Sequence, residues 1–258
     1  MDKPNNLLVT GLVEPGLMRL TLNRPAQYNA LSEELLGELQ LEFDEISRNA
    51  DIRVVILAAS GNAFCTGHDL KQMMNRPSLD YYQKLFTQCT KFMMTLQKMP
   101  QVVIAQIQGV ATAAGCQLVA MCDLAVASDQ ATFAVSGVNL GLFCSTPSVA
   151  LSRNFSRKRA FELLITGDFM NAQEALENGL INRVVSDSDL EKKTLALARQ
   201  ILSKTPASVR TGKTLFYKQL EMGIEAAYQL AGQSMACNMM DHQAQDGVAG
   251  FINKNKKG

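Results

Sequence analysis

Two nearly uninterrupted apolar runs limit the folds that this chain can adopt. Residues 53–59 are RVVILAA and residues 102–107 are VVIAQI. Short runs of β-branched residues without polar alternation are typical of strands that are buried on both faces of a sheet. Such strands need helices on both sides, and amphipathic helical patterns occur between and after them. The chain is therefore predicted to be an α/β protein.

The other elements follow from shorter patterns in the sequence. Residues 17–22 alternate apolar and polar side chains and predict a half-buried strand, whereas residues 79–98 have the apolar spacing of an amphipathic helix. Residues 60–78 are expected to form a loop and then a polar, methionine-rich, mobile connection. Ser32 is expected to cap a helix, strands are expected at 122–128 and 131–135, and further helices are expected near 147–153, 157–166, 172–178, 188–204, 207–220, 224–239 and 242–253.

Strand signals become rare after residue 146, whereas helical signals continue to the C-terminus. We therefore divide the chain into an α/β core of residues 1–194 and a helical C-terminal region of residues 195–258.

Charge and composition narrow the possible functions. The 25 Lys and Arg residues nearly balance the 24 Asp and Glu residues, so no basic field for general nucleic-acid binding is expected. The N-terminus lacks the apolar core of a signal peptide, and no apolar segment reaches membrane-spanning length. A cytoplasmic location is expected, although a processed mitochondrial chain would look the same. The six cysteines are expected to be buried free thiols, and two histidines exclude a histidine-rich metal site.

The stretch GVATAAGCQL at residues 109–118 joins an apolar strand to a predicted helix. Its small residues leave the backbone exposed, and a helix N-terminus favours negative charge on a ligand. The same small residues would also suit close packing of a strand against a helix. The stretch alone leaves both interpretations open.

Four stretches carry a resemblance to a known family. They are LNRPAQYNAL at 22–31, AFCTGHDLK at 63–71, GVATAAGCQLVAMCDLAVAS at 109–128, and GFINKNKK at 250–257. In this order they resemble the crotonase superfamily, or enoyl-CoA hydratase/isomerase family, and most of all its enoyl-CoA hydratase domain-containing branch. The resemblance covers nearly the whole chain. It implies a spiral of ββα units with a helical C-terminal trimerisation region, assembled as a homotrimer or a dimer of trimers.

The resemblance also implies a ligand, an acyl-coenzyme A thioester, with coenzyme A as part of the substrate and no covalently bound cofactor. Two backbone N–H groups, of His68 and Ala114, would grip the thioester oxygen. Ala113 and Ala114 stand where many members have glycine; alanine keeps the N–H, but its Cβ narrows the approach. The positions that match coenzyme-A contacts are Arg24, Gln27, His68, Asp69 and Leu70, together with Phe251 and Lys254, which would reach the ligand of a neighbouring subunit.

Two further residue groups leave alternatives open. Lys254, Lys256 and Lys257 could add positive charge for the coenzyme, or they could form an ordinary solvated tail. Met73 and Met74 could line the acyl site or pack in the core.

The standard proton-handling residues are missing. Hydratases of the family use two glutamates, and the matching positions here are Gln117 and Gly137, neither of which gains or loses a proton near neutral pH. A third family position, which carries an aspartate in some members, is Ser145. The resemblance therefore implies a nominal enoyl-CoA hydratase, an acyl-CoA lyase or isomerase, whose ordinary hydratase activity is weak or absent. The alternative is a non-catalytic acyl-CoA-binding or regulatory and assembly protein.

Other roles remain open for these side chains. Gln117 could orient a water or a substrate carbonyl, or it could be a buried amide without catalytic duty. Cys144 is expected to be a small apolar filler rather than a nucleophile, and Ser145 to cap the helix that begins near Pro147. The imidazole of His68 could face solvent or the coenzyme, with proton transfer as a further role.

Overall fold

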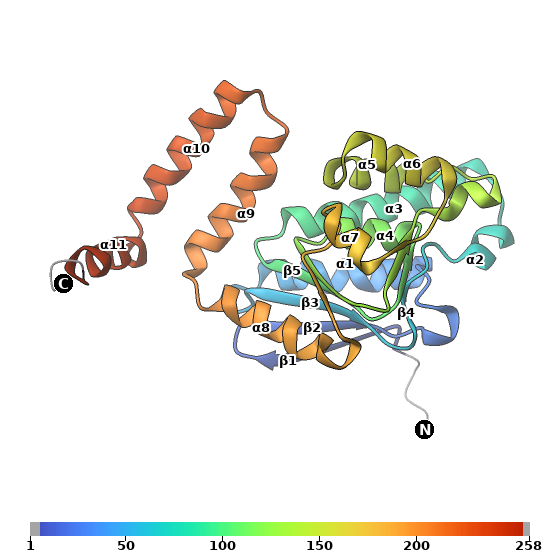
Figure 1. The fold of residues 1–258 in the computed structure, drawn as a ribbon, viewed down its shortest axis with the longest axis horizontal. Coiled ribbons are helices and arrows are strands. Elements are labelled where there is room, and N and C mark those ends of the chain that lie inside the picture. Colours follow the sequence, from blue (N-terminus) through green and yellow to red (C-terminus); the bar gives the residue numbers. More distant parts are fainter. Residues whose placement is uncertain (1–5, 255–258) are drawn as a thin grey trace.

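A six-stranded sheet forms one layer of the molecule (Figure 1). The computed structural model describes residues 6–254, apart from the side chain of Lys254. The strand order is β1-β2-β3-β5-β7-β10, and every neighbouring pair is parallel except β1 and β2. The bounds are β1 Leu8–Glu14, β2 Leu17–Leu22, β3 Val54–Ala59, β5 Val102–Ile107, β7 Leu124–Ser128 and β10 Arg183–Val185.

The remaining strands form a second, four-stranded sheet. Its order is β4-β6-β8-β9, with β4, β6 and β8 parallel and β9 antiparallel to β8. The bounds are β4 Ala63–Cys65, β6 Val110–Thr112, β8 Thr132–Ala134 and β9 Met170–Asn171. The chain thus alternates between the sheets, from β3 to β4, from β5 to β6 and from β7 to β8, with helices after each pair. This is the predicted spiral of ββα units.

Helices cover both faces of the larger sheet, as the two apolar runs predict. Val55 and Leu57 of β3 pack in one core cluster with side chains of α1 Glu33–Arg48, α3 Leu79–Lys98 and α4 Ala114–Met121. Val54 and Ile56 pack in a second cluster with α8 Leu190–Leu202. Three more helices complete the body, namely α5 Ser145–Asn154, α6 Arg157–Thr166 and α7 Ala172–Glu177.

The segment expected to be a mobile connection is instead partly helical, which corrects the prediction. Helix α2 runs from Leu70 to Asn75, and the carboxylate of Asp69 caps it by accepting the N–H of Gln72 at 3.2 Å. Met73 is buried and fixes the helix to the core. The short strands β4, β6, β9 and β10 were not separately predicted because two or three residues are too few to show a period.

The last three helices form an arm that projects from the body (Figure 1). They are α9 Pro206–Leu220, α10 Ile224–Met239 and α11 His242–Lys254. The only buried residue of α9 is Lys213, and α10 has none. Large apolar side chains of the arm are exposed, among them Ile224, Tyr228, Met235, Met240 and Phe251.

The proposed division between residues 194 and 195 falls inside α8 and stays a prediction. No helix among residues 6–254 is long and apolar enough to cross a membrane.

Candidate active site

The ends of two neighbouring parallel strands bring the sequence stretches 63–71 and 109–128 together. β4 and β6 pair with Cys65 opposite Ala111, so the loops that follow them begin at the same edge of the sheet. Gly67 and Ala114 meet there. A Cβ added to Gly67 would lie 2.9 Å from the Cβ of Ala113 and 3.1 Å from the amide nitrogen of Ala114.

The two amides expected to face a ligand are not used inside the protein. The backbone next to His68 is held by Leu31, whose N–H donates to Gly67 at 2.7 Å and whose carbonyl accepts from Asp69 at 3.2 Å. Ala114 is the first residue of α4, where an N–H has no partner within the helix. Within residues 6–254, neither the His68 N–H nor the Ala114 N–H donates a hydrogen bond.

The glycines of the small-residue stretch serve packing, whereas Ala113 shapes a turn. A Cβ on Gly109 would lie 2.0 Å from the carbonyl oxygen of Asn62, and one on Gly115 would lie 2.0 Å from that of Cys65. Ala113 has φ 51° and ψ −122°, in a region that strongly favours glycine. The packing interpretation therefore holds for Gly109 and Gly115, and the ligand-facing role of the backbone at Ala114 stays a prediction.

Replacing Ala113 with glycine is expected to raise the free energy of unfolding by about 1 kcal/mol, because the relief of backbone strain exceeds the added chain entropy of glycine. Denaturant unfolding measures this difference. Ala120→Gly, in the last turn of α4, is the control and is expected to lose about 1 kcal/mol. A loss of stability in both variants would show that the backbone conformation of Ala113 does not strain the fold.

His68 is partly buried, and both nitrogens of its imidazole are shielded from solvent. Its ring packs edge-on against Phe86 of α3, with centroids 5.4 Å apart. Burial lowers its pKa to about 4, although the nearby carbonyl of Leu31 opposes the shift. Neither ring nitrogen has a hydrogen-bond partner among the described residues. The ring is therefore neutral at physiological pH and has unused hydrogen-bonding capacity.

Gln117 lies one turn into α4, on the same helix face as Ala114. Helical side chains lean toward the N-terminus of their helix, so its amide covers the turn that begins at Ala113. The side chain is 5% exposed, and its Oε1 has no hydrogen-bond partner among the described residues. Gln117 is therefore a buried amide whose oxygen is left without a partner by residues 6–254, and its role stays a prediction.

Gly137 lies beside the strained turn, in the 3-10 helix Ser136–Leu140. Thr112 at the end of β6 and Ser136 join the two segments, with their hydroxyl oxygens 3.0 Å apart. A Cβ on Gly137 would lie 2.5 Å from the carbonyl oxygen of Leu142 and 2.8 Å from the Sγ of Cys144. The loop after Gly137 therefore occupies the space that any side chain at this position would need.

Cys144 and Ser145 occupy the start of α5, where the prediction for Ser145 was wrong. Ser145 is the first helical residue, and Cys144 is the N-cap, which gives no side-chain cap. The Ser145 hydroxyl donates instead to the carbonyl of Phe143 at 3.3 Å. Cys144 is buried, and burial raises the pKa of its thiol, as expected for a filler rather than a nucleophile.

An ion pair ties together two of the positions expected to contact the coenzyme. The guanidinium of Arg24 donates to the Asp69 carboxylate at 2.9 Å and to the carbonyl of Ala30. Burial acts to raise the pKa of Asp69, but the Arg24 hydrogen bond and the N–H groups of α2 outweigh it, so the pKa is lowered. This pair fixes the first turn of α2 against the loop that contains Gln27.

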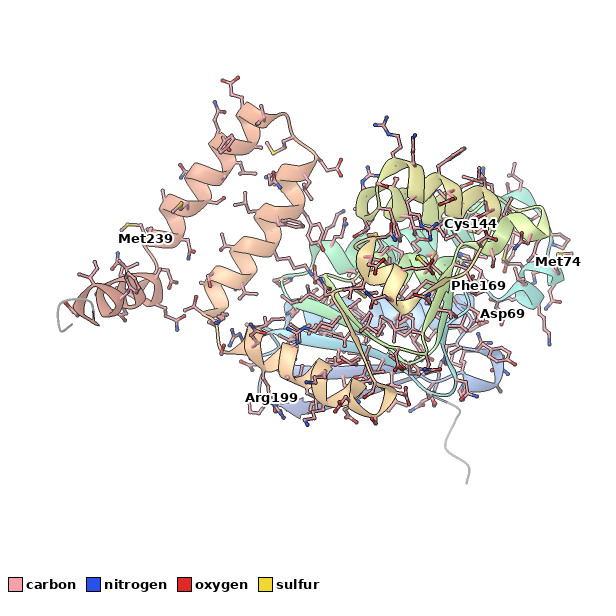
Figure 2. All side chains as sticks on the ribbon, in the orientation of Figure 1. Asp69, Met74, Cys144, Phe169, Arg199 and Met239 are labelled. Carbon is pink, nitrogen blue, oxygen red and sulfur yellow. The ribbon has the colours of Figure 1, made fainter. Side chains whose placement is uncertain are left out.

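The remaining predicted positions are spread over the molecule. Leu70 is half exposed at the start of α2, and Met74 is exposed while Met73 is buried. Figure 2 places Asp69 and Met74 at the opposite end of the molecule from Met239, which lies in the arm. Phe251 is exposed on α11, the Lys254 side chain lies outside the described residues, and so do Lys256 and Lys257.

A buried network that the sequence did not indicate connects the arm to the body. The Lys213 amine of α9 donates to Asp123 at 2.6 Å and to the carbonyls of Leu96 and Gln101, each at 2.7 Å. Tyr217 also donates to Asp123, at 2.9 Å. Burial lowers the pKa of Lys213 and raises that of Asp123, and the opposite charge of each partner opposes the shift.

Comparison with known proteins identifies the family of this chain. The family model described as enoyl-CoA hydratase/isomerase matches residues 13–258. The human protein named enoyl-CoA hydratase domain-containing protein 3, mitochondrial, is 44% identical over 93% of this chain and 80% of its own length. A crystal structure of an enoyl-CoA hydratase from Mycobacterium smegmatis is 54% identical, covers 96% of both chains and superposes with a TM-score of 0.95. The crystal structure of the human domain-containing protein 3 is 42% identical, covers 96% of this chain and 98% of its own, and has a TM-score of 0.93. On these grounds the chain belongs to the enoyl-CoA hydratase/isomerase family.

Proposed function

We propose that this protein binds the thioester of an acyl-coenzyme A and stabilises its enolate between the backbone amides of His68 and Ala114. One observation carries the proposal. Two amides without acceptors lie on either side of Gly67, where a methyl group would already touch both Ala113 and Ala114. Fixed N–H donors act best where negative charge develops in the reaction, because they need no reorganisation at that moment.

The protein lacks the groups for ordinary hydration. Adding water across a double bond requires groups that accept and donate protons, and neither Gln117 nor Gly137 can do so. We therefore propose a crotonase-type acyl-CoA lyase or isomerase of fatty-acid metabolism with weak or no hydratase activity on crotonyl-CoA. Ser145 stays a candidate for a polar contact, since its exposed hydroxyl is held only by the carbonyl of Phe143.

The second candidate function is a non-catalytic acyl-CoA-binding protein with a regulatory or assembly role. The absence of both expected carboxylates favours it, since binding requires the amides but not a proton carrier. A panel of acyl-CoA thioesters incubated with the protein and analysed by mass spectrometry separates the two functions. Formation of any product that depends on the amides argues for the enzyme.

Ala114→Pro is the decisive variant, because proline lacks the N–H proposed to hold the oxygen. Product formation is expected to fall at least a hundredfold, the size of effect seen when one oxyanion donor is removed. The control is Arg157→Pro, which removes an N–H at the first residue of the exposed start of α6 and should leave activity unchanged. Unchanged turnover in Ala114→Pro, with coenzyme A still bound, would contradict the proposal.

We propose that the coenzyme is held near Arg24, Gln27, Asp69 and Leu70 and that Phe251 and Lys254 of a neighbouring subunit complete its site. The arm that carries Phe251 extends away from the end of the molecule where Asp69 lies (Figure 2). Its exposed apolar side chains are suited to a homotrimer or a dimer of trimers. The location, whether cytoplasmic or mitochondrial as in the names of the human and mouse relatives, stays a prediction.

A further inference from the structure

We propose that Asn29 is a positioning residue of the candidate site, which holds the N–H of His68 in line with the thioester oxygen without itself touching the ligand. This inference rests on the proposed function, because it assumes that the oxygen lies at the His68 and Ala114 amides. It goes further by naming the side chain that fixes one of these amides. That side chain lies in the loop before α1, outside the two segments that carry the amides.

The first observation is the way in which Leu31 holds the backbone around His68. Leu31 donates its N–H to the carbonyl of Gly67 at 2.7 Å and accepts the N–H of Asp69 at 3.2 Å. These bonds form an isolated parallel bridge between Leu31 and His68. In such a bridge, the residue between the two bonded neighbours directs its own N–H away from the partner segment. The direction of the His68 N–H is therefore set by the position of Leu31.

The second observation is that Asn29 ties the loop that carries Leu31 to the start of β4. Asn29 is completely buried, with 0% exposure, and its φ of 54° lies in the left-handed region, where asparagine is more common than most residues. Its Oδ1 accepts the N–H of Arg24 at 2.9 Å, which closes the loop on itself. Its Nδ2 donates to the carbonyls of Ser60 at 2.9 Å and Ala63 at 2.8 Å.

One buried side chain thus holds both sides of the bridge at His68. On one side Asn29 fixes the loop of residues 24–31, and on the other it fixes Ala63, the first residue of β4, which leads toward His68. Buried hydrogen bonds resist displacement, because breaking one leaves a buried polar group unpaired. A backbone donor stabilises an oxyanion only when it is already aimed at the oxygen. Loss of the Asn29 side chain is therefore expected to leave the His68 N–H present but misdirected.

Two further contacts join the same loop and segment, and they should preserve the fold without Asn29. Asp69 pairs with Arg24 at 2.9 Å, and the Thr66 hydroxyl donates to the carbonyl of Tyr28 at 3.3 Å. Both contacts involve side chains that are partly exposed, where water competes for the hydrogen bonds. They keep the loop near the segment but hold it less firmly, so misalignment rather than unfolding is expected.

Asn29→Gly is the decisive variant, because glycine adopts a positive φ freely and removes the side chain while keeping the turn. The matched control is Gln101→Ala. Gln101 is 2% exposed, and its Nε2 also donates to two backbone carbonyls, those of Ile46 at 2.7 Å and Asn49 at 3.1 Å. Both variants lose two buried donated hydrogen bonds, so similar losses of stability are expected.

Infrared spectroscopy of bound butyryl-CoA, labelled with carbon-13 at the thioester carbonyl, measures the alignment of the two amides. Hydrogen bonds to a carbonyl lower its stretching frequency, so the natural protein should displace the band from its position in free butyryl-CoA. In Asn29→Gly the displacement is expected to shrink by about half, since one of the two donors is misdirected. Gln101→Ala should keep the full displacement. An equal loss in both variants would show that Asn29 supports the fold only in general and would overturn the inference.

The other outcomes separate this inference from the proposed function. A full displacement in Asn29→Gly would overturn the role of Asn29 and leave the proposed function intact. A band that stays at its free position in the natural protein would overturn both.

Hydrogen exchange in the natural protein covers the case in which Asn29→Gly fails to fold. The Leu31 amide should exchange slowly with and without butyryl-CoA, because its bond to Gly67 is part of the fixed bridge. The His68 amide should become protected only when the thioester is bound. Rapid exchange at Leu31 without ligand would show that the bridge is not fixed beforehand, and this result would also overturn the inference.

Discussion

Replacing Lys213 with alanine is expected to lower the free energy of unfolding by about 3 to 5 kcal/mol, the usual consequence of removing one partner of a buried ion pair. The amine of Lys213 satisfies the Asp123 carboxylate and two backbone carbonyls at once. Without it, Asp123 keeps only the N–H of Val103 and the hydroxyl of Tyr217. An under-compensated charge then stays buried beneath the start of the arm.

The control for Lys213→Ala is Lys218→Ala, at an exposed position on the same helix, which should change stability by no more than about 0.5 kcal/mol. A double variant with Asp123→Asn should lose less than the sum of the two single losses, because the second change removes the charge that the first left unpaired. Urea unfolding of the natural protein, the three single variants and the double variant measures the differences. A loss below about 1 kcal/mol in Lys213→Ala would show that the pair does not stabilise the fold.

Restoring both family glutamates is expected to fail as a gain of function. Glutamate at position 137 would place its Cβ against the carbonyl of Leu142 and the thiol of Cys144. The first of these is backbone, so the whole loop must move, and we expect the free energy of unfolding to fall by about 3 kcal/mol. The Gln117→Glu and Gly137→Glu double variant should therefore hydrate crotonyl-CoA only slowly, as should Gln117→Glu alone.

Gly212→Glu provides a matched comparison for this double variant. Gly212 lies in α9 with nothing within 4 Å of an added Cβ, and glutamate favours helix there. This variant should be as stable as the natural protein or slightly more stable. Hydration assays with crotonyl-CoA and thermal unfolding compare the double variant with Gly212→Glu. Fast hydration by a stable double variant would show that the loop yields easily and that only the missing acids limit the hydration that we expect to be weak in the natural protein.

The sequence predicted the elements with clear periods and the backbone of the site. Strand β2 and helices α3, α6 and α10 have the predicted bounds, because their apolar spacing extends over a whole element. The resemblance to the family, carried by the stretches 63–71 and 109–128, pointed to the segments of Gly67 and Ala114, which the structure brings together. These features depend on residues close together in the chain.

The features that escaped prediction depend on distant residues or on backbone angles. Lys213 reaches Asp123 from 90 residues away, and nothing in either local sequence indicates the partner. The packing of the His68 ring depends on Phe86 of α3, and the closed loop over Gly137 depends on Leu142 and Cys144. The positive φ of Ala113 could not be read either, since alanine is not the residue that such a conformation favours.

The arm has a consequence for the newly made chain. Its apolar side chains, including Ile224 at 77% exposure and Tyr228 at 74%, are left uncovered by residues 6–254. A newly synthesised chain therefore exposes an apolar surface on its arm even after its body has folded. The chain escapes aggregation or degradation only if a partner covers this surface in time. Its abundance in the cell should therefore depend more steeply on the rate of synthesis, which sets the concentration of partners, than on the stability of the body.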